Sequence, residues 1–150
     1  IEISNCAGKI LEKASQGAYK IQPVIRHGKE VETCLAPEER LTEKLRELLE
    51  GIKRKGFETI AVVTKEEEEA AQVRQMLEME EEGELFHNGV MVLPVRLTKG
   101  LEFDAVILWK PDEAHYAAKP QDAKLLYVAV TRALHELYLL GDQKNSSLFE

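Results

Sequence analysis

The chain alternates short runs of apolar, often β-branched residues with longer stretches in which apolar residues recur every three or four positions. The short runs are typical of buried strands and the longer stretches of amphipathic helices. The pattern predicts strands over Ile21–Arg26, Phe57–Val63, Val90–Val95, Asp104–Trp109 and Leu137–Leu140, and helices over Ile1–Gln16, Ala36–Gly51, Thr64 to about Met79, and Leu125–Val130. Strands separated by helices indicate right-handed crossovers and a mostly parallel sheet that is covered on both faces.

Local signals at the helix ends refine two of these boundaries. Pro37 suits the first turn of the helix over Ala36–Gly51, and Gly51 stands where a terminating glycine belongs. Thr64 and Glu67 have the spacing of a capping box, which predicts the start of the next helix.

The composition describes one ordinary globular domain. The chain has 150 residues, of which 44% are hydrophobic and 31% charged. No apolar run approaches the roughly 18–20 residues that a membrane span needs, and no signal peptide is visible at Ile1. Two cysteines, Cys6 and Cys34, cannot form a disulfide framework. We therefore expect reduced thiols in a cytoplasmic protein with no membrane partner.

The formal net charge of -7 is unevenly distributed. The segment from Glu66 to Glu84 holds nine glutamates and one arginine, so the rest of the chain is close to neutral. Such a run is most often a solvated helix face. The remaining surface can still carry a basic path for nucleic acid, although bulk attraction to nucleic acid is not expected.

Several kinds of site are not supported by the sequence. Neither Gly8-Lys9-Ile10 nor Gly28-Lys29-Glu30 completes a P-loop, so the chain lacks a phosphate-binding loop of its own. No Gly-x-Ser-x-Gly nucleophile elbow occurs. The four histidines are far apart in the sequence and have no second ligand at metal-binding spacing, so no metal site is expected; they are His27, His87, His115 and His135.

Two stretches carry the strongest functional signal. Lys99–Asp104 reads Lys-Gly-Leu-Glu-Phe-Asp and leads into the predicted strand that ends at Trp109. Leu126–Leu134 reads Leu-Tyr-Val-Ala-Val-Thr-Arg-Ala-Leu and stands just before the predicted strand Leu137–Leu140. The pair resembles motifs V and VI of superfamily 1 DNA helicases of the UvrD/Rep type. This resemblance implies that residues 1–150 form a single C-terminal RecA-like domain, called 2A, taken from a longer chain. The short interval between Met79 and Val90 leaves no room for the 2B insertion, so the chain looks most like the helicase IV/HelD-like branch.

The resemblance also implies roles at the nucleotide. Arg132 matches the arginine finger, and Glu102 matches the motif V carboxylate that accepts a hydrogen bond from the ribose, next to Gly100. Lys65 stands where the strand of the motif IV region ends in an arginine. The alternatives are that Arg132 caps the preceding helix, that Glu102 pairs with Lys99, and that Lys65 is an ordinary lysine at a helix start.

Nucleic-acid contacts are predicted in the same motif V stretch. Arg96 and Lys99 could hold phosphates, and Thr98 could donate its hydroxyl to one. The alternative is a solvated loop. Tyr116 and Trp109 are the nearby aromatic candidates for base stacking, and Trp109 is expected in the core instead.

The expected function is that of the second motor domain of an ATP-dependent DNA helicase or translocase. ATP with Mg²⁺ would be shared with an N-terminal RecA-like domain, and single-stranded or partly duplex DNA would be the partner. The 150-residue chain alone is expected to be inactive. One alternative is a HelD-like module that docks RNA polymerase through the acidic helix, and another is a catalytically silent scaffold.

Overall fold

A central sheet with five parallel strands organises the domain, as the alternating pattern predicts. The computed structural model describes residues 31–79, 86–87 and 89–149. The strands are β1 (Val31–Leu35), β2 (Ile60–Thr64), β3 (Phe86–His87), β4 (Val90–Pro94), β5 (Phe103–Trp109) and β6 (Ala133–Gly141). Their order is β1-β6-β5-β2-β4-β3, and only β3 pairs antiparallel. The elements expected over Ile1–Gln16 and Ile21–Arg26 lie outside the described residues.

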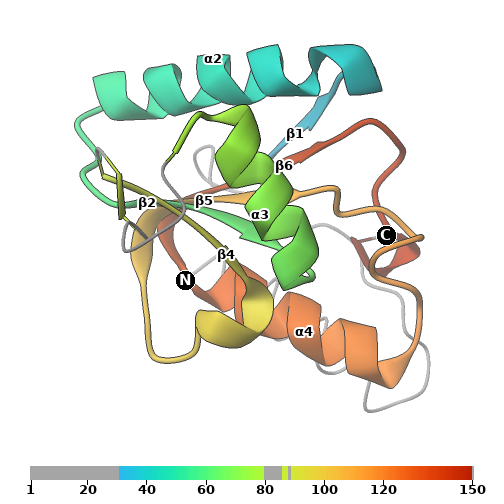
Figure 1. The fold of residues 1–150 in the computed structure, drawn as a ribbon. Helices are drawn as coiled ribbons and strands as arrows, with labels where there is room; N and C mark the ends of the chain where they lie inside the picture. Colours follow the sequence, from blue (N-terminus) through green and yellow to red (C-terminus); the bar gives the residue numbers. More distant parts are fainter. Residues whose placement is uncertain (1–30, 80–85, 88, 150) are drawn as a thin grey trace.

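Helices cover both faces of this sheet (Figure 1). On one face lie α2 (Leu41–Arg54) and α3 (Glu67–Met76), and on the other lies α4 (Pro120–Thr131). Successive residues of β2 alternate between the two cores: Ile60 and Val62 pack with α2 and α3, whereas Ala61 and Val63 pack with α4. The result is a three-layer α/β domain of the RecA-like kind.

Three 3₁₀ turns complete the described chain. They are η1 (Glu38–Arg40) before α2, η2 (Val95–Leu97) after β4, and η3 (Ser147–Phe149) near the end. Residues of η2 and η3 join the core on the α4 side of the sheet. The η2 turn matters most, because it begins the loop that carries the first of the two motifs.

The structure corrects several predicted boundaries. Strand β1 was not predicted; it lies at the sheet edge, where only Cys34 among its residues is buried. Helix α2 continues through Gly51 to Arg54, and Gly56, with a φ of 93°, follows its end. Helix α4 begins at Pro120, five residues before the predicted start, with the proline in its first turn.

The capping box of α3 lies two residues beyond the predicted pair. Glu66 is the N-cap, its backbone N–H donates to Glu69 Oε1 at 3.1 Å, and the reciprocal bond is also present. Thr64 is buried instead, and its hydroxyl donates to the carbonyl of Glu66 at 2.7 Å. Helix α3 ends at Met76, three residues before the predicted Met79.

The acidic first turn of α3 is only partly a solvated face. Glu67 Oε2 lies 2.9 Å from Nη1 of Arg74, a buried guanidinium that also donates to the carbonyl of Val92. Glu69 Oε2 lies 2.6 Å from Nε2 of His115. Two of these glutamates therefore hold α3 to its surroundings, while Glu68 is exposed.

A buried polar cluster joins the end of α2 to the beginning of β6. Glu136 is 5% exposed, and Lys55 Nζ lies 2.9 and 3.1 Å from its two carboxylate oxygens. The Tyr138 hydroxyl donates to Glu136 and accepts from Lys55 Nζ at 2.9 Å. Burial, together with the bond to Glu136, raises the pKa of Tyr138 to about 12. The pKa of Lys55 is also raised, mainly by its hydrogen bond to Tyr138.

We expect this cluster to make the domain sensitive to alkali. A pKa that is higher in the folded state stabilises the fold below the unfolded pKa, near 10 for tyrosine, and that stability is lost as the pH rises through about 12. Urea unfolding of the domain between pH 8 and pH 12 should show this loss. Tyr138→Phe should lose less stability over the same interval, and an equal loss in both proteins would contradict the assignment.

Candidate nucleotide and nucleic-acid interface

The two helicase-like motifs meet at the amino ends of two adjacent strands. Phe103, at the start of β5, pairs in register with Ala133, at the start of β6. The backbone N–H of Phe103 donates to the carbonyl of Arg132 at 2.9 Å. The residues that directly precede these strands, Glu102 and Arg132, therefore lie on the same edge of the sheet.

The side chain of Arg132 holds the motif V loop. It is half-buried, and its Nη1 donates to the carbonyls of Thr98 at 3.4 Å and Leu101 at 3.2 Å. Its Nη2 donates to Thr131 Oγ1 at 3.2 Å. Its Nε is buried and has no hydrogen-bond partner within the described structure. The guanidinium thus binds the neighbouring loop and does not cap the carbonyls of α4.

The loop between η2 and β5 turns sharply at Gly100. Leu101 N–H donates to the carbonyl of Thr98 at 3.0 Å, and Gly100 adopts a φ of 81°. A Cβ on Gly100 would meet nothing within 4 Å, so the glycine is required by the backbone conformation and not by space. Glu102 is exposed, and no ion pair among the described residues joins it to Lys99.

The structure does not support the predicted role of Thr98. This residue is fully buried, and its hydroxyl donates to the carbonyl of Val95 at 2.6 Å. The hydroxyl proton is therefore used to close the η2 turn and does not face a phosphate. Arg96 and Lys99 are both exposed, as a phosphate contact requires.

Lys65 does not lie with Arg132. It follows β2 at the carboxyl ends of the parallel strands, whereas Arg132 precedes β6 at their amino ends. Its Nζ lies 3.2 Å from Asp122 Oδ1, and the Lys65 side chain is 20% exposed. The predicted contact of Lys65 with the γ-phosphate is not supported, because its charge is paired at the other end of the sheet.

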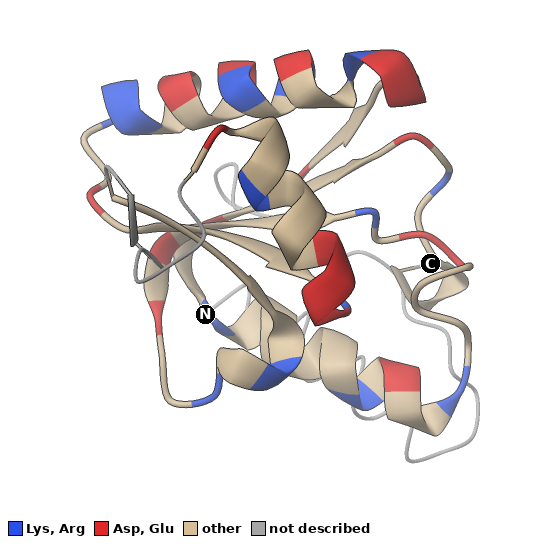
Figure 2. Ribbon diagram, viewed as in Figure 1, with Lys and Arg blue, Asp and Glu red and all other residues tan. Residues whose placement is uncertain are grey.

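Lysines gather instead around a hollow beside the first turns of α4. We call it the lysine hollow; its volume is about 510 Å³ and its lining is Lys65, Glu66, Lys99, Lys119, Gln121, Asp122, Lys124, Leu125 and Val128. Figure 2 shows basic residues along α4 and in the loop that leads into it, although the chain as a whole is acidic. Four lysines face two carboxylates here, so the hollow is locally positive.

Neither aromatic candidate offers a stacking surface. Tyr116 is fully buried and Trp109 is 2% exposed, so the prediction for Tyr116 is wrong and Trp109 lies in the core as expected. Burial also raises the pKa of the Tyr116 hydroxyl, which has no hydrogen-bond partner in the described structure. Among the described residues, the rings of Phe57 and His135 stack on each other, with their centroids 5.5 Å apart.

The described residues contain no cluster of three or more side chains that could hold a metal ion. The ring of His115 contacts two carboxylates: its Nδ1 lies 2.6 Å from Asp112 Oδ1 and its Nε2 lies 2.6 Å from Glu69 Oε2. This pairing connects the start of α3 to the segment between β5 and α4.

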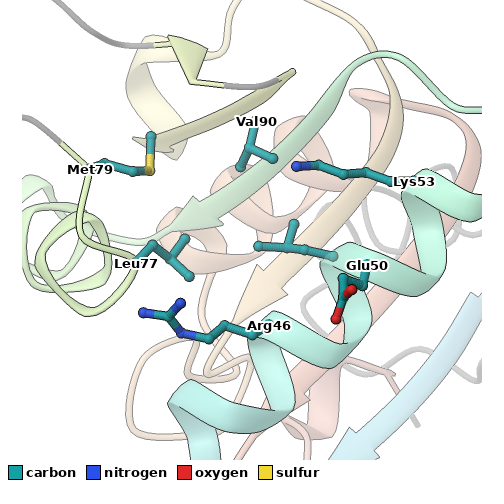
Figure 3. Close-up of a pocket in the computed structure, with 7 residues that line it drawn as sticks. Arg46, Glu50, Lys53, Leu77, Met79 and Val90 are labelled. Carbon is teal, nitrogen blue, oxygen red and sulfur yellow. The ribbon is translucent and has the colours of Figure 1, made fainter.

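A second hollow of about 320 Å³ lies on the opposite face of the sheet (Figure 3). It opens between α2 and the end of α3, where Arg46 Nη2 donates to the carbonyl of Met76 at 2.8 Å. Its lining is Arg46, Leu49, Glu50, Lys53, Leu77, Met79 and Val90. None of these residues belongs to the helicase-like motifs.

Comparisons with known proteins agree with this geometry. A family model described as the UvrD-like helicase C-terminal domain matches residues 89–140, which include both motifs. A crystal structure of the C-terminal domain of a possible DNA helicase from Lactobacillus plantarum WCFS1 is similar, with 26% identity, a TM-score of 0.74, and coverage of 98% of this chain and 88% of that chain. No curated protein matches the chain. Among the described helices, none has the length and apolar character for a membrane span. Residues 89–140 are therefore similar to UvrD-like helicase C-terminal domains, and the fold of the chain is similar to that of a possible helicase's C-terminal domain.

Proposed function

We propose that these residues form the second motor domain of an ATP-dependent DNA helicase or translocase. The observation that carries the proposal is the placement of Arg132, half-buried and held by the motif V loop, beside exposed Glu102 at one edge of the sheet. An arginine fixed in this way can stabilise negative charge on a phosphoryl group without first being ordered. Glu102 offers a free carboxylate to accept from the ribose.

The residues present fit one side of an ATP site. The Nε of Arg132 is buried without a partner, so the guanidinium retains an unused donor. The sequence has no P-loop, and the described residues have no metal-binding cluster. Bound ATP would supply the phosphoanhydride whose hydrolysis drives the motor, and a separate RecA-like domain would hold its phosphates and Mg²⁺.

We further propose that DNA phosphates bind at the lysine hollow and at Arg96. Lys99 and Lys124 are exposed and line the hollow, and no ion pair within the described residues holds either of them. Lys119 is also exposed, with its Nζ 4.0 Å from Asp122 Oδ2. Such lysines can hold a DNA backbone without reading its sequence. In this proposal Lys99 replaces Thr98 as the main contact from the loop.

ATP hydrolysis and DNA unwinding test the proposal. The full protein that contains this domain should hydrolyse ATP faster when single-stranded DNA is added. The 150-residue chain alone should show negligible turnover, because it supplies the arginine and not the phosphate-binding loop. Turnover by the 150-residue chain, or a full protein whose hydrolysis does not respond to DNA, would contradict the assignment.

A further inference from the structure

Asp122 is a buried carboxylate in the lining of the lysine hollow, and we call Asp122 and the largely buried Lys65 the floor of the hollow. Asp122 is 4% exposed and lies in the first turn of α4. One carboxylate oxygen accepts from the backbone N–H of Ala117 at 2.9 Å, and the other lies 3.2 Å from Lys65 Nζ. Ala117 lies five residues before Asp122, whereas Lys65 is distant in the sequence, so the carboxylate joins the end of β2 to the segment before α4 and to α4 itself.

This arrangement divides the lysines of the hollow into two kinds. The Lys65 side chain is 20% exposed and already faces a carboxylate, whereas the Lys119 side chain is 56% exposed and lies farther from the same carboxylate. Withdrawing Lys65 from Asp122 would leave a buried carboxylate without its counter-charge, which is costly. A phosphate that approached Lys65 would also approach the negative charge of Asp122.

We propose that Asp122 is a positioning residue that reserves Lys65 as an internal counter-charge and keeps phosphates away from the floor of the hollow. DNA phosphates are then held by the rim lysines, which are Lys99, Lys119 and Lys124. The hollow therefore favours an extended backbone that passes over its rim and rejects a compact anion seated on its floor. This inference rests on the proposed binding of DNA at the hollow.

The salt dependence of DNA affinity measures how many phosphates the protein neutralises. For single-stranded DNA, the plot of log affinity against log salt concentration changes in slope by about 0.7 for each phosphate contact. We would measure this slope by fluorescence anisotropy with a labelled oligothymidylate and the full protein. Lys99→Gln and Lys124→Gln should each make the slope shallower by about 0.7.

The decisive variant is the double substitution Lys65→Gln with Asp122→Asn. It preserves the net charge of the hollow and leaves two side chains that can hydrogen-bond to each other. The slope should equal that of the unmodified protein, because Lys65 holds no phosphate. A slope as shallow as that of Lys99→Gln would overturn the inference while leaving DNA binding at the hollow intact.

Asp122→Asn alone tests the same idea in the opposite direction. It releases Lys65 and should steepen the slope by about 0.7, because one more lysine becomes available to phosphates. If Asp122 had only a structural role, Asp122→Asn would lower the melting temperature without steepening the slope. If this variant does not fold, the charge-matched double variant decides the question.

If Lys99→Gln and Lys124→Gln both leave the slope unchanged, the proposed DNA site fails and the inference fails with it.

Discussion

Arg132→Ala is expected to lower kcat for DNA-stimulated ATP hydrolysis in the full protein by about a thousandfold or more, as removal of an arginine finger does. The guanidinium is already fixed by the carbonyls of Thr98 and Leu101. Its positive charge therefore needs no reordering at the moment when negative charge develops on the phosphate oxygens. Steady-state hydrolysis at saturating ATP and DNA measures the effect. Arg132→Lys should recover only part of the rate, because lysine lacks the planar fork.

A control is needed because Arg132 also holds the loop. Thr98→Val removes the hydroxyl bond to the carbonyl of Val95 and loosens the same loop while leaving the guanidinium in place. We expect Thr98→Val to lower the melting temperature but to retain most of kcat. If it lowers kcat as much as Arg132→Ala does, then Arg132 acts by ordering the loop and not on the phosphate. An unchanged rate in Arg132→Ala would favour a catalytically silent scaffold.

The double variant Glu67→Lys with Glu69→Lys is expected to destabilise the domain by about 3 kcal/mol. It breaks the capping box at Glu66, places two positive charges at the amino end of α3, and removes the carboxylates that face Arg74 and His115. Loss of the counter-charge matters most at Arg74, which is 7% exposed. Urea unfolding at neutral pH measures the change.

Glu68→Lys is the matched control for this change. Glu68 is exposed, so a single reversal there should cost less than about 1 kcal/mol, mainly through the helix dipole. An equal loss of stability in both variants would contradict the roles given to Glu67 and Glu69. The comparison also bears on the alternative of RNA polymerase docking. If all of these glutamates were reversed, weaker capture of RNA polymerase in a pull-down could come either from a lost contact or from unfolding of the domain. Glu68→Lys changes the charge of the surface without this loss of stability, so it tests the docking surface alone.

The sequence predicts the sheet well because buried parallel strands are almost wholly apolar. Strand β2, with every residue buried, is the clearest case. Strand β1 was missed for the opposite reason: Glu32 and Thr33 are exposed at the sheet edge, so no apolar run marks it. The capping box was displaced because consecutive glutamates offer several pairs with the same spacing.

The candidate site was predictable in part. Both motifs precede strands, and parallel pairing brings the amino ends of β5 and β6 together, so Glu102 and Arg132 could be grouped from the sequence. The same rule separates Lys65 from them, because Lys65 follows a strand and therefore lies at the opposite edge of the sheet. The pairing of Lys65 with Asp122 and the burial of Thr98 and Tyr116 depend on contacts between distant segments, which periodicity cannot show.

The position of β1 in the sheet has a consequence for synthesis of the protein. Val31 pairs with Leu137, so the edge strand must wait for a partner that is translated about a hundred residues later. Contacts so distant along the chain form slowly, because the intervening segment must first be closed into a loop. On the ribosome, the strands from β2 to β5 can assemble beforehand, whereas β1 can pair with β6 only after β6 has emerged.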